Sequence, residues 1–330
     1  MRSQIFKTRI TELFNIPHPI LCGGLQWLAD ARYVAAVVNA GGMGFITCMS
    51  FPDDPEAFRR EVQKCKDLTG GKPFGVSVPI SRRLGANDRL NPYLDIIVDE
   101  GVRFIETSGD SPERLLPRLK AAGCIVIHKA PGIRYALSAQ QLPVDAITVV
   151  SAEGGGHPGT LMVPQIIQGP LAADALRKPL ALAGGMSTGR HLISALAMGA
   201  DAILMGSRMV VAEEIWAHRA YKEYVVGIDE NANRVVMKTF RNHHRVLDNE
   251  TSRAVEQLEL QGIKDFDHYQ PHVDGSLARQ AYESGNFNLG MIDMGPSGVF
   301  AREIKPVEAI IDEIIDEANS ARERIGQICC

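Results

Sequence analysis

Eight short apolar runs recur along the first two-thirds of the chain, separated by polar and mixed stretches. They are PILCG (19–23), GFIT (44–47), FGVSVP (74–79), FIETS (104–108), CIVIH (124–128), AITVV (146–150), LALAG (180–184) and AILMG (202–206). The runs are continuous rather than alternating with polar residues, which is typical of parallel strands that helices cover on the outside. The intervals between the runs are long enough for one helix each. The pattern therefore predicts repeated strand–helix units.

Helical patterns fill several of these intervals. Apolar residues recur at helical spacing over residues 28–42, 55–68, 111–123 and 188–200. Gly41 and Gly42 end the first of these patterns, as a helix C-cap does. Eight strand–helix units predict an α/β fold, a (β/α)8 TIM barrel over residues 1–212. A doubly wound open sheet is the competing fold, and it is less favoured because the cluster GGMG (41–44) lacks the G-x-G-x-x-G spacing and precedes a strand.

The repeat ends after the eighth run, and the next segment has a different pattern. Helices are predicted over residues 212–228, 250–262 and 274–285. Residues 213–289 are therefore expected to form a helical lid that carries a substrate subdomain. Residues 290–330 contain one more amphipathic helix, expected to pack back on the barrel. No metal site is predicted in the lid, although it is rich in histidines, because no pair has a helical metal spacing with a third ligand, and His243 and His244 would point to different sides of a helix.

Composition and charge limit the classes of partner. The 330 residues carry a formal net charge of −4 and no basic run, so neither a nucleic acid nor an anionic membrane is an expected partner. No stretch approaches about 18 consecutive apolar residues, and the first residues lack the apolar core of a signal peptide, so we expect a cytoplasmic protein. The six cysteines lack C-x-x-C spacing and are expected to be buried or incidental thiols, with Cys329 and Cys330 in a frayed tail.

Glycines cluster after the predicted strands, where the loops of a barrel form its active face. Gly184 and Gly185 follow the seventh run, and Gly206 and Ser207 follow the eighth. A glycine backbone can approach an anion closely, and the N-terminus of a helix, here capped by Thr188, attracts negative charge. Either turn alone would be an ordinary tight turn, but two in neighbouring positions predict a phosphate site.

The stretch SAEGGGHPG (151–159) brings a histidine to the end of the sixth run. An isolated histidine is more often structural, but the three glycines before His157, Pro158 after it and its place at a strand end favour a role toward a substrate. Glu153 is expected to orient this loop or His157, or to be a solvated carboxylate. Lys129 directly follows the fifth run and points either over the barrel mouth, near a phosphate or cofactor, or to the surface.

Several motifs occur together in one family, and in its order. They are HPILCGGLQWLADARYVAAVVNAGGMGFI, KPFGVSV, VIHKA, EGGGHPG, LALAGGMSTGRHLISALAMGADAILMGSRM and FRNHHRV. With them the chain resembles the nitronate monooxygenases, formerly called 2-nitropropane dioxygenases. This family of FMN-dependent barrels includes NAD(P)H:quinone reductases and the flavin-type enoyl-acyl-carrier-protein reductase. The resemblance runs from about residue 8 to residue 248, continues weakly through GNFNLGMIDMG (285–295), and is not specific to one reaction.

The resemblance implies FMN and the residues that contact it. These are Gly23, Gly24, Leu25, Ser77, Lys129, Gly155, Gly156, Gly184, Gly185, Gly206 and Ser207, with the phosphate at the last four. The resemblance also makes His157 the residue that faces the substrate. The chain departs from the family at Cys22, where Gln is frequent, at Ser77, where Asn is frequent, and at Gly155, where Ala is common. It also departs in GNFNLGMIDMG (285–295), which changes the pocket wall.

The resemblance favours oxidation of alkyl nitronates or nitroalkanes with O2, with His157 as general base. The alternative within the family is an NAD(P)H-dependent flavin reductase that acts on quinones or an enoyl thioester. A third hypothesis is a flavin-free barrel that binds or isomerises a phosphorylated metabolite. A small molecule is the expected partner in every case, and the resemblance makes a homodimer plausible.

Overall fold

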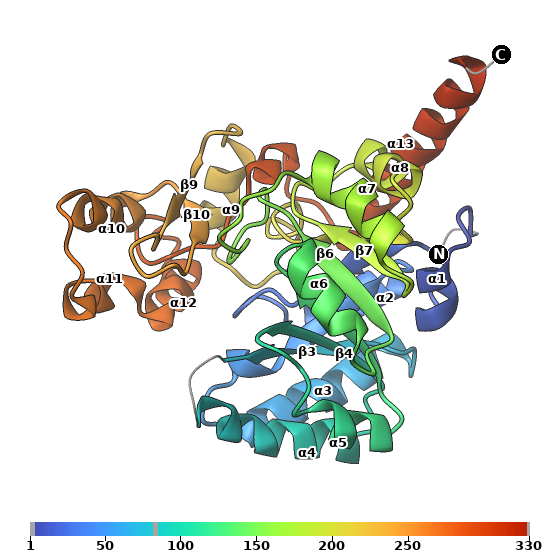
Figure 1. Cartoon of the computed structure of the whole chain (residues 1–330), viewed down its shortest axis with the longest axis horizontal. Helices are drawn as coiled ribbons and strands as arrows, with labels where there is room; N and C mark the ends of the chain where they lie inside the picture. Colours follow the sequence, from blue (N-terminus) through green and yellow to red (C-terminus); the bar gives the residue numbers. More distant parts are fainter. Residues whose placement is uncertain (1–3, 82–84, 329–330) are drawn as a thin grey trace.

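A closed barrel of eight parallel strands forms the centre of the structure (Figure 1). The computed structural model describes residues 4–81 and 85–328. The strands are β1 (Ile20–Cys22), β2 (Met43–Thr47), β3 (Gly75–Ile80), β4 (Phe104–Gly109), β5 (Ile125–Ala130), β6 (Ala146–Val150), β7 (Leu180–Ala183) and β8 (Ala202–Met205). They follow one another round the barrel, and β1 closes it by pairing with β8. Each predicted run forms one strand, so the predicted (β/α)8 barrel is confirmed.

Apolar side chains fill the inside of the barrel. Phe45 from β2 and Phe104 from β4 belong to one buried cluster, together with small residues such as Ala181 from β7. Helix α1 (Arg9–Phe14) adds Phe14, whose ring centroid lies 5.2 Å from that of Phe104. The interior is thus a packed core and not a channel, which leaves the rim at the carboxyl ends of the strands for ligands.

Helices connect the strands on the outside of the barrel. They are α2 (Ala31–Asn39), α3 (Pro55–Thr69), α4 (Asn91–Asp99), α5 (Leu116–Ala121), α6 (Ile133–Gln140), α7 (Gln165–Ala175) and α8 (Gly189–Ala197), with 3-10 turns η1 (Cys48–Ser50) and η2 (Ala86–Leu90). The four predicted helices are present as α2, α3, α5 and α8. Local caps set their ends: the Asp30 carboxylate accepts from the Tyr33 N–H at 2.9 Å, so α2 begins at Ala31 and not at residue 28.

The insertion after β8 combines helices with a hairpin that the sequence did not predict. Its elements are α9 (Arg219–Val226), β9 (Asn233–Val236), β10 (His244–Leu247), α10 (Glu250–Leu260), η3 (Phe266–His268), α11 (Gln270–Val273) and α12 (Gly275–Ser284). β9 and β10 pair antiparallel, and Val236 and Val246 pack with Val255 and Tyr269 in a small separate core. Figure 1 shows this hairpin together with α10, α11 and α12 at one end of the molecule.

The chain then returns to the barrel. Isolated bridges join Gly156 to Arg245 and Val246 to Asp293, so the hairpin contacts both a barrel loop and the returning chain. The last elements are η4 (Pro296–Phe300) and α13 (Val307–Ile328). Helix α13 packs against α8 and α2 and buries four isoleucines, so the predicted terminal helix is present.

Three further expectations concern thiols, metals and membranes. Cys22, Cys48, Cys65 and Cys124 are buried free thiols, as predicted, whereas Cys329 and Cys330 lie outside the described residues. Across residues 4–81 and 85–328, no group of three or more His, Cys, Asp or Glu side chains is arranged to hold a metal ion. Within the same ranges, no helix has the length and apolar character needed to cross a bilayer.

We predict that Gly189→Ala loosens the contact between α8 and α13. A β-carbon at residue 189 would lie 2.2 Å from the Ala318 nitrogen and 2.3 Å from the Ile314 oxygen, both backbone atoms that cannot rotate away. Such overpacking typically lowers the free energy of unfolding by about 1–3 kcal/mol. Urea unfolding measures the change. The matched control is Gly326→Ala, since a β-carbon there has no neighbour within 4 Å; equal unfolding curves for the two variants would contradict the prediction.

Candidate functional site

The loop that carries His157 begins where β6 ends. The Glu153 carboxylate accepts the Gln165 backbone N–H at 3.1 Å, at the first residue of α7, and it also accepts the Ser151 hydroxyl. Glu153 therefore ties the two ends of the loop together. Of the roles considered from the sequence, the structure supports the one in which Glu153 orients the loop.

The glycines before His157 lie against other parts of the main chain. A β-carbon on Gly155 would come 2.8 Å from the Gly295 nitrogen. Gly156 has a φ of +84°, a backbone conformation that residues with a β-carbon rarely adopt. Its backbone exchanges hydrogen bonds of 2.9 and 2.7 Å with that of Arg245. Close packing on the insertion and on the returning chain thus accounts for both glycines. Their contact with a cofactor, expected from the resemblance, stays a prediction.

His157 lies against His244, which in turn contacts Asp293, and the sequence assigned neither residue to the site. Its ring stacks on that of His244, with centroids 4.2 Å apart and planes 17° apart. The His244 Nε2 atom lies 2.6 Å from Asp293 Oδ1. His244 begins β10, and Asp293 lies in the returning chain, so three distant segments supply the three side chains. The sequence offered no signal for this arrangement beyond the motifs FRNHHRV and GNFNLGMIDMG, because the arrangement depends on the unpredicted hairpin.

The surroundings favour a neutral His157 beside an ionised Asp293. Desolvation, assisted by repulsion from His244 and opposed by Asp293, lowers the pKa of His157 to about 4. Desolvation raises the pKa of Asp293, but the charge and hydrogen bond of His244, with His157 and Lys129, more than offset this, and the net pKa is lowered. By surface area both residues are exposed. Solvent therefore partly screens the charges around the two residues.

A buried carboxylate joins the residues expected at the first loops. Glu106 on β4 is fully buried, and its Oε1 accepts the Ser77 hydroxyl at 2.8 Å and the Gly24 N–H at 3.1 Å. The Lys129 ammonium lies 3.0 Å from the same oxygen. Lys129 thus points into this cluster and not to the surface. Sequence reasoning missed Glu106, although one carboxylate within the apolar run FIETS was an available signal.

The turns after β7 and β8 form a cradle of backbone donors. Gly184 and Gly185 have φ values of 91° and 73°, which glycine adopts without strain. Among the described residues, the N–H groups of Gly185, Gly206 and Ser207 have no acceptor in the protein. A β-carbon on Gly206 would meet only Leu25, at 3.6 Å. Free N–H groups at the carboxyl ends of neighbouring barrel strands suit a phosphate.

The N-terminus of α8 differs from what the sequence led us to expect at the phosphate site. Thr188 caps α8 as predicted, by accepting the His191 N–H. The Gly189 N–H, however, donates to the Glu317 carboxylate of α13 at 2.8 Å. The first donor of this helix is therefore already bonded, and the cradle depends on the turns before α8 and after β8.

The arrangement suits FMN, which carries a phosphate at one end and a polar ring with an N–H group at the other. The backbone cradle suits the phosphate. Glu106 Oε2 is buried and has no hydrogen-bond partner among the described residues. A β-carbon on Gly23 would lie 3.2 Å from that oxygen, so the orphaned acceptor faces the first loop, where the resemblance puts the ring.

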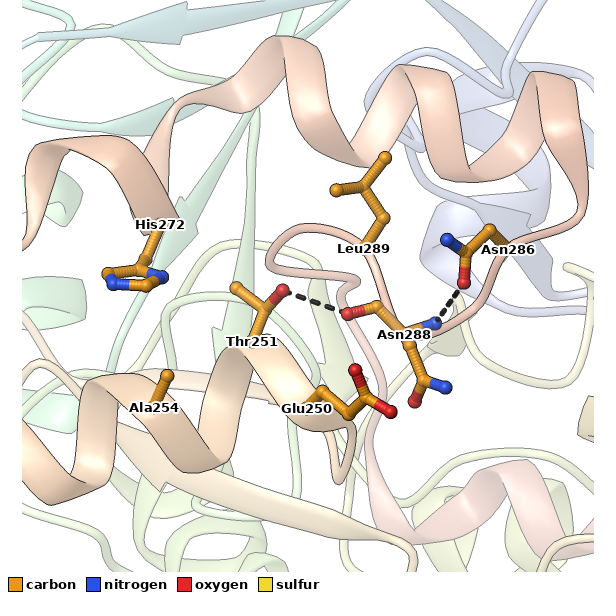
Figure 2. Close-up of a pocket in the computed structure, with 7 residues that line it drawn as sticks. All are labelled: Glu250, Thr251, Ala254, His272, Asn286, Asn288 and Leu289. Carbon is orange, nitrogen blue, oxygen red and sulfur yellow. Dashed lines mark hydrogen bonds between the residues drawn. The ribbon is translucent and has the colours of Figure 1, made fainter.

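A pocket of about 290 Å³ lies within the insertion, and Figure 2 shows the residues that line it. Glu250, Thr251, Ala254, His272, Asn286, Asn288 and Leu289 line it. The polar contacts drawn there are internal, since Thr251 Oγ1 donates to the Asn288 carbonyl at 2.9 Å and the Asn288 N–H donates to Asn286 Oδ1 at 3.2 Å. None of the predicted site residues lines this pocket.

Comparison with known protein families identifies the family of this chain. Residues 7–317 match the family model described as nitronate monooxygenase. The chain belongs to the nitronate monooxygenase family. It is therefore an oxidoreductase, and the family predicted from the motifs is confirmed.

The proteins that this chain resembles are named for different activities. A Mycobacterium tuberculosis protein, named (3aS,4S,5R,7aS)-5-hydroxy-7a-methyl-1-oxo-octahydro-1H-indene-4-carboxyl-CoA dehydrogenase, is 33% identical over 77% of this chain and 68% of its own. A probable nitronate monooxygenase of Staphylococcus aureus is 25% identical over 95% of this chain and 98% of its own. The structure of FabK from Thermotoga maritima superposes with a TM-score of 0.89 at 28% identity, over 98% of this chain and 99% of that one.

We predict that Glu106→Gln destabilises the barrel rim. The substitution keeps the shape but removes the negative charge that faces the Lys129 ammonium at 3.0 Å. Loss of a buried charged acceptor typically costs about 1–3 kcal/mol in the free energy of unfolding. Thermal and urea unfolding measure it. Glu12→Gln is the control, because it removes the same charge from an exposed pair with Lys7 and is expected to change nothing measurable. Equal effects would contradict a special role of Glu106.

Proposed function

We propose that this protein is an FMN-dependent nitronate monooxygenase that oxidises alkyl nitronates or nitroalkanes with O2. The observation that carries the proposal is His157, an accessible histidine with a lowered pKa on the barrel rim that also carries the Glu106–Lys129 pair and the N–H cradle. The barrel, residues 1–212, binds the cofactor, and residues 213–289 face the substrate.

Different residues on the rim would bind the phosphate and the ring of FMN. The N–H groups of Gly185, Gly206 and Ser207 would hold the phosphate, and Gly184 would let the backbone approach it. Gly23, Gly24, Leu25, Ser77, Gly155 and Gly156 would hold the ring. Lys129 and the free Glu106 oxygen would bind its polar edge. When bound, FMN supplies electron acceptance and the reaction with O2. The protein supplies binding, orientation and proton transfer.

His157 performs the proton transfer in this proposal. A lowered pKa keeps its imidazole neutral at pH 7, so that it accepts the proton from the carbon next to the nitro group of a neutral nitroalkane. With a nitronate, from which that proton has already gone, His157 only positions the anion. Loss of His157 should therefore matter much more for the neutral substrate.

A second candidate is an oxidoreductase of an acyl thioester that uses NAD(P)H. The observation in its favour is the 33% identical relative, whose name describes a dehydrogenase of a hydroxylated carboxyl-CoA compound. In that reaction His157 would orient the substrate or exchange a proton with it.

Anaerobic titration of the purified protein tests the two candidates. Bleaching of the flavin absorbance by a nitronate, without bleaching by NADH or NADPH, is the expected result. Rapid bleaching by a nicotinamide and none by the nitronate would support the second candidate. A colourless protein that stays colourless with added FMN would overturn both and favour a flavin-free barrel.

We predict that His157→Asn retains FMN but loses about 10²–10⁴-fold in kcat/KM for a neutral nitroalkane, the usual contribution of a general base. The loss for the corresponding nitronate should be much smaller, because no proton is removed. Steady-state assays with both substrates and the flavin absorbance measure this. Unchanged activity on the neutral substrate would remove His157 from the base role.

We also predict an unusual pH dependence. A histidine whose pKa is lowered to about 4 stays an effective base until the pH falls toward 4, whereas an ordinary one would be protonated below about 6.5. The acid limb of kcat/KM for a neutral nitroalkane should thus lie well below pH 6.5. A limb at or above pH 6.5 would show that His157 is not desolvated in the active enzyme.

A further inference from the structure

The His244–Asp293 pair has the features of an acid–base group. The two atoms that join them, Nε2 and Oδ1, lie 2.6 Å apart. An ionised carboxylate only accepts hydrogen bonds, so Nε2 of His244 carries the proton in this contact. The other ring nitrogen, Nδ1, has no hydrogen-bond partner among the described residues and is not among their buried unpartnered atoms. A neutral His244 therefore presents Nδ1 as an accessible acceptor, with a carboxylate behind the ring.

This pair lies directly beside the residue that faces the substrate. The stack on His157 keeps the two imidazoles parallel, with centroids 4.2 Å apart. A β-carbon on Gly156 would lie 3.1 Å from Asp293 Oδ2, so the second carboxylate oxygen packs on the same loop. The pair is thus held against the loop of His157 and is not an isolated surface contact.

The neighbouring charged groups leave the pair intact. Lys129 acts on Asp293 by charge alone, since its ammonium is bound to Glu106. Arg245 points elsewhere: its guanidinium donates to the Ala152 carbonyl and to the side chain of Asn233. Tyr221 and Tyr282 are buried phenols whose pKa values are raised by desolvation and also by the charge of Asp293. Both therefore stay neutral and add no charge near the pair. Glu153 is bound within its loop.

We infer that His244, with Asp293 positioning it, is a second proton-transfer residue of this site and serves a substrate that carries a hydroxyl or carbonyl oxygen at the reacting carbon. The proton of the hydroxyl passes to Nδ1 of His244, the O–H bond breaks, and the oxygen keeps the electron pair. Asp293 then stabilises the imidazolium that has formed. In the reverse direction, His244 returns the proton to the oxygen.

The inference rests on the proposed function in one respect: the substrate must bind beside His157. It goes further by giving the site two proton-transfer groups with different tasks. His157 serves the carbon and His244 serves the oxygen. A nitronate has no hydroxyl at its reacting carbon and does not need His244. A hydroxylated or keto acyl compound does need it, so the pair equips the site for the second candidate substrate class.

The test uses p-nitrophenol, which combines a nitro group with a hydroxyl that ionises near neutral pH and turns yellow when it does. FMN-loaded protein in excess is titrated from pH 5 to 9, and the phenolate absorbance is followed by difference spectroscopy. A base beside the hydroxyl should lower the ionisation midpoint of the bound phenol by about one pH unit or more. His244→Gln should abolish this shift, and Asp293→Asn should reduce it by more than half.

Two controls separate this role from a structural one. His243→Gln changes the adjacent histidine, which takes no part in the stack or in the bond to Asp293, and should keep the full shift. Nitrobenzene lacks the hydroxyl and should bind all variants equally. No shift in the unaltered protein, or a shift that survives in His244→Gln, would overturn the inference. Failure of the proposed function is seen separately, as absent FMN absorbance or absent bleaching, and the phenol titration can then be read on the FMN-free protein.

Discussion

The close approach of the Gly154–Gly156 loop to the Asp293–Gly295 segment is the contact on which the site depends. A side chain at Gly155 would collide with the Gly295 backbone, at a separation of 2.8 Å. Only glycine lets the two segments meet, and their contact brings the hairpin strand β10 to the barrel rim through the bridge between Gly156 and Arg245. The insertion is therefore part of the site, since it supplies one of the two stacked imidazoles.

A second constraint acts on the neighbouring strands β3, β4 and β5. Glu106 is a carboxylate enclosed in a barrel, where an unpaired charge would be strongly unfavourable. Ser77, the Gly24 N–H and Lys129 all converge on one of its oxygens, which leaves the other without a partner. A fold that needed only stability would satisfy both oxygens or use an apolar residue. We therefore propose that the polar edge of the ligand binds at this free oxygen.

The sequence predicted the barrel well because each buried parallel strand is a continuous apolar run, a signal that does not depend on distant residues. Helix ends were less certain: residues 111–123 have a helical pattern, but only Leu116–Ala121 form a helix, with Pro112 before it. The hairpin was missed because its strands are four residues long and two of their apolar residues, Val236 and Val246, pack in a small separate core. The contact between His244 and Asp293 was missed for the same reason. The two residues lie 49 positions apart in the chain and meet only through tertiary structure.

The two halves of the site differ in how freely they can change. The cradle and the Glu106 cluster are built from strand ends, whose positions are fixed by hydrogen bonding around a closed barrel, so a substitution there disturbs many neighbours. The insertion has a small core of its own, but its residues Tyr221, Leu247 and Tyr282 pack in the main core. His244 and Asp293 belong to neither core, so exchanging them should disturb the packing little. In the function that we propose, the barrel sets the cofactor chemistry, and the groups that the insertion brings to the rim set which proton moves.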